Sequence, residues 1–138
     1  MTVNAVDAIS FAGAVTGNQN LTVGVASTIA FNSTVGASSA IGTGTGDAIT
    51  VNDTGTCTFD NTVRTQSGIH QDVNSTIVFK GSITQIAGGV GSTDSVFNGN
   101  VIFTNAAALT YESVRSITFG SEPTLDDITI NGTSSVIL

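Results

Sequence analysis

Ile77-Val78-Phe79-Lys80-Gly81-Ser82-Ile83 shows the sequence pattern from which the architecture can be predicted. An apolar residue is followed two positions later by phenylalanine and, four positions after that, by a second apolar residue. The same pattern, some copies weaker than others, begins at Ile9, Ile29, Cys57, Val101 and Ile117. A pattern that returns along the chain in this way indicates a repeat architecture, in which each unit packs on its neighbours.

A second apolar position precedes each copy by eight residues and is usually followed by threonine, as in Leu21-Thr22 and Ile49-Thr50. The chain therefore reads as seven copies of a two-strand unit that start at residues 1, 21, 49, 69, 93, 109 and 128. Alternation along a strand sends every second side chain to the same face. We expect an interior ladder made of Phe11, Phe31, Phe59, Phe79, Phe103 and Phe119, with Leu138 in the last unit and Phe97 outside the ladder.

The composition favours strands and tight turns. Of 138 residues, 40% are hydrophobic and only 9% are charged, with 16 glycines and one proline. β-Branched residues suit a pleated surface, while Gly, Asn and Ser favour turns. We expect one all-β domain over residues 1–138, a parallel β-solenoid (β-helix) of about seven coils. A β-sandwich or jelly roll is the alternative, because strands at intervals of eight to twelve residues also suit it.

The charge balance excludes one class of partner. The net charge is −7, and the basic residues are Arg64, Lys80 and Arg115. Three scattered cations do not supply the basic footprint that a phosphate backbone requires, so we expect no nucleic-acid binding. The sequence contains no run of 18 apolar residues, so we expect no membrane insertion. Its first residues, Met1-Thr2-Val3-Asn4, do not resemble a signal peptide. The composition resembles that of bacterial extracellular proteins, which predicts an extracellular or cell-surface location.

Residues that could carry chemistry are few. His70 is the single histidine and stands at an outward position, and Cys57 takes the place of an isoleucine in the repeat. Gly42 to Thr50 partly matches a calcium-binding repeat through Asp47, but no second copy follows it. Asp72 and Glu112 share one position in the repeat, two units apart. We expect no catalytic residue, no cofactor, no metal site and no enzymatic activity; a β-helix enzyme that acts on polysaccharide is the less favoured alternative.

Two long connections, residues 36–48 and 84–92, interrupt the regular spacing and leave the same corner of the predicted fold. They are either simple insertions or a surface for recognition or lateral contact.

Turns such as Phe97-Asn98-Gly99-Asn100 and Phe31-Asn32-Ser33-Thr34 resemble those of the right-handed parallel β-helix repeats in autotransporter passenger domains. These include the rickettsial surface antigens and the chlamydial polymorphic outer-membrane proteins. The resemblance covers most of the chain and implies a secreted, adhesive or fibrous surface role. It carries over no catalytic residue.

Both ends of the sequence are in phase with the repeat. An exposed terminal unit offers unpaired backbone groups to another strand, and neither end of the sequence shows a cap, a helix or a charged guard. We therefore expect a structural protein that associates with itself head to tail through Met1, Val3, Val136 and Leu138. The alternative is a fragment of an autotransporter adhesin that binds a host surface or a glycan.

Overall fold

The computed structural model describes residues 1–25, 27–52, 55–72, 74–86, 91–104, 108–111, 117–119, 128–130 and 135–137. Within these residues the regular secondary structure consists of β-strands, and the strand pairs that they form are parallel. The all-β prediction is confirmed. The alternative of a β-sandwich is not supported, since the sheets of such folds are antiparallel.

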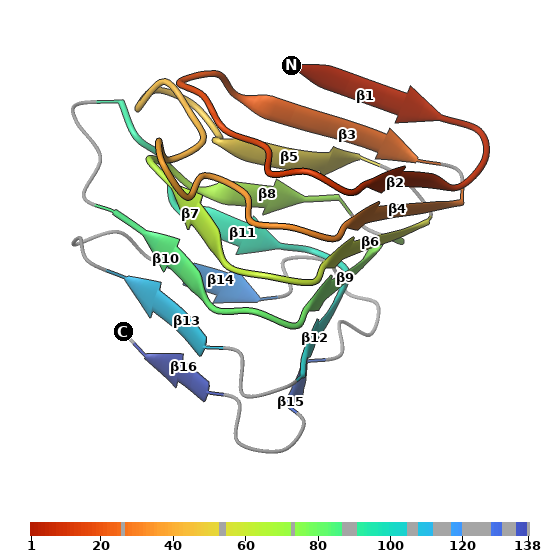
Figure 1. The fold of residues 1–138 in the computed structure, drawn as a ribbon. Coiled ribbons are helices and arrows are strands. Elements are labelled where there is room, and N and C mark those ends of the chain that lie inside the picture. Colours follow the sequence, from red (N-terminus) through yellow and green to blue (C-terminus); the bar gives the residue numbers. More distant parts are fainter. Residues whose placement is uncertain are drawn as a thin grey trace.

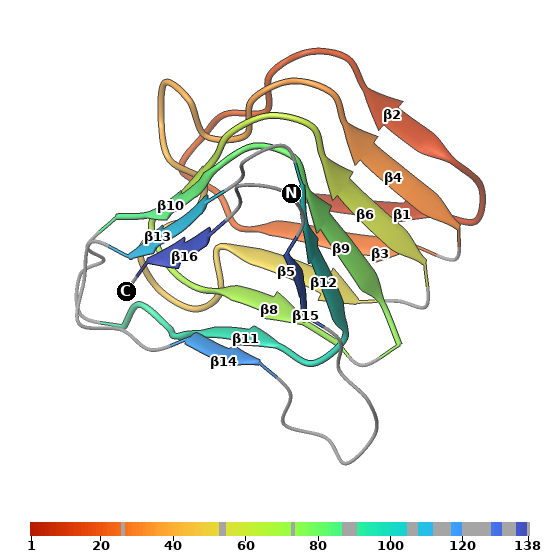
Figure 2. The same cartoon turned by 90° about the horizontal axis from the view of Figure 1, so that it is seen from below.

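The strands form three parallel sheets (Figures 1 and 2). Sheet A contains, in spatial order, β1 (Thr2–Ala5), β3 (Leu21–Val25), β5 (Ile49–Asn52), β8 (Ile69–Gln71), β11 (Ser95–Phe97) and β14 (Ile117–Phe119). Sheet B contains β2 (Ile9–Phe11), β4 (Thr28–Phe31), β6 (Thr56–Phe59), β9 (Thr76–Phe79), β12 (Asn100–Phe103) and β15 (Ile128–Ile130). Sheet C contains β7 (Val63–Thr65), β10 (Ile83–Gln85), β13 (Ala108–Tyr111) and β16 (Ser135–Ile137).

Single-residue bridges extend sheet C toward the N-terminal part of the chain. Val15 pairs with Val35, and Val35 pairs with Val63. These valines, with Ile83, are the second apolar position of the phenylalanine pattern. The pattern therefore marks two neighbouring sheets, and each repeat contributes to three sheets, not two.

Alternation along the strands separates an inner from an outer face. In β5, Ile49 and Val51 are buried while Thr50 is partly exposed, and in β6 Cys57 and Phe59 are buried while Thr58 is partly exposed. The parallel register places similar residues of successive strands side by side, as with Ile49 and Ile69 in sheet A. The apolar side chains thus gather between the three sheets in one core.

The predicted unit starts fall on sheet A in the first part of the chain but not in the last part, and the seven predicted two-strand units correspond to six layers of strands in sheets A and B of the described residues. The starts at 1, 21, 49 and 69 fall in or beside strands of sheet A, as predicted. The units expected at 109 and 128 instead fall in β13 of sheet C and β15 of sheet B. A third strand per repeat has the same apolar alternation as the other two, so spacing alone assigned these strands to the wrong sheets.

As a result, two phenylalanines lie in other positions than the sequence pattern predicts. Phe119 was predicted in the ladder with Phe103, but its strand β14 pairs with β11 in sheet A, where Phe119 lies beside Phe97 in register. Phe97 was placed outside the ladder, yet its side chain is fully buried. Because sheets A and B both carry phenylalanine in this region, alignment by phenylalanine could not distinguish them.

Candidate functional site

The phenylalanines of sheet B form a column of stacked rings. Ring centroids lie 4.9 Å apart for Phe11 and Phe31, 5.0 Å for Phe31 and Phe59, 5.3 Å for Phe59 and Phe79, and 5.6 Å for Phe79 and Phe103. The spacing follows that of parallel strands, because each strand contributes one ring at the same register.

Phe97 joins this column from sheet A. The rings of Phe97 and Phe79 form a T-shaped pair, with their centroids 6.3 Å apart and an interplanar angle of 87°. The core therefore connects sheets A and B through aromatic contacts.

Burial decreases toward the end of the column at β1 and β2. Val23, Ile29, Phe31 and Val35 are buried, whereas the residues one repeat earlier are only partly buried. Those earlier residues are Val3, Ile9, Phe11 and Val15. The outer edge of the first repeat thus leaves part of the apolar interior accessible, and we refer to it as the open end.

Only part of the predicted interface belongs to this open end. Met1 has 52% of its surface exposed, and Val3 packs against the core from the edge strand β1. Val136 lies in β16, the edge strand of sheet C at the opposite end of the stack. Leu138, predicted both for this interface and for the ladder, lies outside the described residues.

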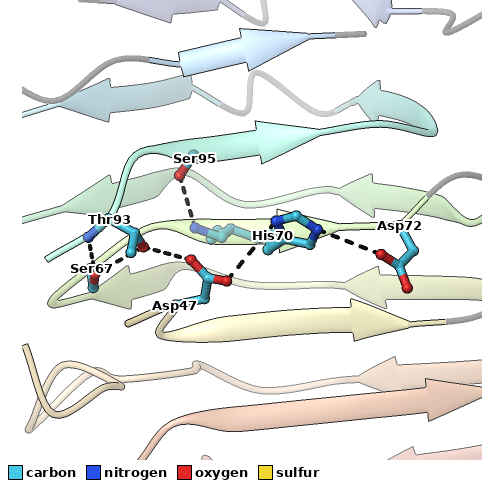
Figure 3. Close-up of polar contacts among 7 residues, drawn as sticks. Asp47, Ser67, His70, Asp72, Thr93 and Ser95 are labelled. Atoms are coloured by element: carbon cyan, nitrogen blue, oxygen red, sulfur yellow. Dashed lines mark hydrogen bonds and ion pairs between the residues drawn. The ribbon is translucent and has the colours of Figure 1, made fainter. Parts of the chain in front are cut away.

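A group of polar side chains surrounds His70, whose own side chain lies on the outer face of sheet A (Figure 3). His70 follows Thr50 in register, in a row whose first members are Thr2 and Thr22. Its Nε2 is 3.5 Å from Asp72 Oδ1, and its Nδ1 is 4.0 Å from Asp47 Oδ2. The imidazole therefore lies between two carboxylates.

Asp47 also contacts Thr93, the residue that directly follows the second long connection. Thr93 Oγ1 donates a 2.6 Å hydrogen bond to Asp47 Oδ1, and the Thr93 amide donates a 2.7 Å bond to Ser67 Oγ. We call Asp47, Ser67, His70, Asp72 and Thr93 the corner cluster.

The two long connections meet at this corner. The amide of Gly46 donates to the carbonyl of Gly91 at 3.0 Å, and Gly46 forms a parallel bridge with Ser92. The first connection also enters the core, because Ala40 and Ile41 are buried and Ile41 pairs with Thr65. The prediction that both connections leave one corner agrees with this arrangement, although the first is more than a surface insertion.

Polar side chains inside the fold were not predicted. Ser95 Oγ accepts a 2.9 Å hydrogen bond from the Ile69 amide and donates to Gln85 Oε1 at 3.1 Å. Gln85 Nε2 in turn donates to the Thr93 carbonyl. These bonds join sheets A and C beneath the corner cluster. The sequence pattern predicted neither the inward position of Ser95 and Gln85 nor the bond between them, because it assigned residues 84–92 to a connection.

The other chemical candidates remain apart from one another. The strand before Glu112 is β13 of sheet C, whereas Asp72 follows β8 of sheet A, so the shared position predicted for these two acids is wrong; Glu112 itself lies outside the described residues. Cys57 is free and buried, and burial raises the pKa of its thiol to about 12. A thiol protonated at neutral pH is a poor nucleophile.

In the part of the chain that the structure describes, no three His, Cys, Asp or Glu side chains gather closely enough to hold a metal ion. The same residues contain no helix with the length and apolar character needed to cross a bilayer. No protein-family model, curated protein or solved structure matches the chain.

Proposed function

We propose that the chain is a parallel β-solenoid with a structural role, which associates with itself end to end to form filaments at a surface or outside the cell. The observation that carries the proposal is the open end: among the described residues no further strand pairs with β1 and β2, and the apolar column extends to them. Three parallel sheets built from repeats of similar register support the solenoid architecture.

The open end has the chemistry of an unprotected sheet edge. Among residues 1–20 the only charged side chain is that of Asp7, and this stretch contains neither lysine nor proline. Natural proteins guard exposed strand edges with charges, proline or a covering segment. Val3 and Phe11 would lose their remaining exposure if another layer of strands paired with β1 and β2, and burial of apolar area is favourable.

The opposite end offers strands of matching direction. β14, β15 and β16 are the outermost strands of sheets A, B and C at that end. Because the strands within each sheet are parallel, a copy placed beyond β1 and β2 by translation along the stack continues the sheets without reversing direction. Such a head-to-tail contact is heterologous, and without ring closure it propagates as an open filament.

The role that follows is mechanical and not enzymatic. The two hydroxyl groups of the corner cluster, those of Ser67 and Thr93, contact each other, and Thr93 Oγ1 donates to Asp47, so both are engaged in bonds other than the nucleophile–histidine bond of a triad. A filament of this kind suits a secreted surface layer, in line with the resemblance to passenger repeats.

The test is assembly of the full chain with two lysine variants of the edge strand. Val3→Lys places a charge toward the interior of the open end and should abolish filaments in negative-stain electron microscopy. Thr2→Lys places the same charge on the exposed outer face of β1 and should leave filaments in place. A chain that sediments as a monomer at high concentration, without filaments, would overturn the proposal and favour the adhesin alternative.

A further inference from the structure

The position of His70 between two carboxylates has a consequence that is independent of self-association. A neutral imidazole has one N–H, so it can donate toward only one of the two acids. The protonated ring donates from both nitrogens. Asp47 Oδ2 lies 4.0 Å from Nδ1 and Asp72 Oδ1 lies 3.5 Å from Nε2, so each nitrogen of the ring has a carboxylate on its side.

Asp47 connects this ring to the rest of the corner. Its Oδ2 faces His70, while its Oδ1 accepts the short bond from Thr93. Gly46, one residue before Asp47, bonds to Gly91 of the second connection. A change in the attraction between His70 and Asp47 therefore acts at the point where the two connections join sheet A.

We propose that His70, Asp47 and Asp72 form a pH-sensitive clasp, which holds the corner segments 43–47 and 91–93 against sheet A when the imidazole is protonated. Histidine takes up its proton in the weakly acidic range, where ordinary aspartates are still ionised. At weakly acidic pH the protonated ring can donate toward both carboxylates, and the clasp is closed. At higher pH the neutral ring has one N–H, so a nitrogen lone pair faces one of the carboxylates. Segments 43–47 and 91–93 should then separate from sheet A more often.

The neighbouring elements do not supply a competing charge directly opposite the ring. In register with His70, β5 presents Thr50 and β11 presents Val96, both uncharged. Asp94 is exposed and lies directly before β11, so it is a further acid near this part of sheet A. His70 and Asp47 are 35% and 31% exposed, so solvent weakens the attraction without removing it.

Hydrogen exchange of the full chain at about pH 5.5 and about pH 8 tests the clasp. After correction for intrinsic exchange rates, the amides of residues 43–47 should be about two- to fivefold more protected at the lower pH, the range expected for a partly exposed ion pair. Sedimentation at both pH values confirms that the state of assembly is the same. Amides of β6 and β9, which lie in sheet B, provide the internal reference.

Two variants should remove the pH difference, and one should keep it. His70→Gln replaces the ring with an uncharged side chain, and Asp47→Asn keeps an acceptor for Thr93 while removing the charge that faces the ring. Asp60→Asn is the matched control, because Asp60 is also 31% exposed and pairs with Lys80 at 2.8 Å, not with histidine. Equal protection at both pH values in the unmodified chain, or a difference that survives in His70→Gln or Asp47→Asn, would overturn the proposal.

Discussion

At the scale of single residues, the aromatic column determines how much stability is lost when one of its phenylalanines is truncated. Phe59 is fully buried and lies between the rings of Phe31 and Phe79. Phe59→Ala should lower the free energy of unfolding by about 3–5 kcal/mol, since it removes a stacked ring and leaves a cavity. Chemical denaturation measures the loss. Thr58→Ala, on the outer face of the same strand, should change stability by less than about 0.5 kcal/mol.

Phe97 provides the contrast between the sequence pattern and the structure. The pattern left it outside the ladder and so implied a smaller loss than at Phe59. Full burial and the edge contact with Phe79 instead predict that Phe97→Ala also costs about 3–5 kcal/mol. A loss below about 1 kcal/mol in the same denaturation experiment would contradict the burial of this ring.

Cys57 should be inert in the folded chain. Its pKa is raised from 9.0 to about 12 by burial, so the thiol stays protonated at neutral pH and reacts with a thiol reagent only after unfolding. Because the pKa is higher in the folded than in the unfolded state, the folded state gains stability below about pH 9 and loses it as pH rises toward 12. This alkaline loss should be smaller in Cys57→Ala, measured by denaturation relative to the stability of each protein at pH 7. Rapid labelling of the folded chain at neutral pH would contradict the assignment.

At the scale of elements, close packing between successive repeats requires glycine at certain turns. A Cβ atom at Gly55, in the turn between β5 and β6, would lie 2.2 Å from the Ser27 carbonyl oxygen of the preceding repeat. Gly55→Ala should therefore destabilise the chain by about 1–3 kcal/mol, the range seen for overpacking. At Gly13 nothing lies within 4 Å of the added atom, so Gly13→Ala should be neutral or stabilising by up to about 1 kcal/mol. Comparable losses at both positions, in thermal or chemical unfolding, would show that the turns are looser than the structure indicates.

The length of each strand and its marker residues explain how far the sequence could predict the elements. Strands around Ile29, Ile49, Cys57 and Ile77 were found because each combines period-two alternation with a phenylalanine or threonine marker. The third sheet was missed because β7 and β10 have only three residues each, too few to distinguish a strand from a connection by periodicity. The open end and the outward position of His70 followed from the repeat. The link from Asp47 to Thr93 did not, because it joins residues 46 positions apart across two connections of unequal length.

At the scale of the whole molecule, the open end and the corner cluster divide the surface into two regions with different physics. The open end is apolar and nearly uncharged, so pairing there should depend weakly on salt. The corner cluster carries carboxylates and the single histidine, so the clasp proposed there should depend on pH. The regions lie on different sides of the repeat stack, one at its end and one beside sheet A, so assembly and the state of the corner can be measured separately.

The proposed filament has a predictable axial repeat. Sheets A and B each contain six strands among the described residues, and neighbouring strands in a sheet are about 4.8 Å apart. If copies continue the sheets by translation, each copy adds six strand layers and the axial repeat should be about 29 Å. Fibre diffraction of aligned filaments should show the strand spacing of about 4.8 Å along the fibre axis, and averaged micrographs should show the longer repeat. Filaments with their strand spacing perpendicular to the axis would indicate side-by-side assembly, and the contact would then have to be sought on the outer faces of the sheets.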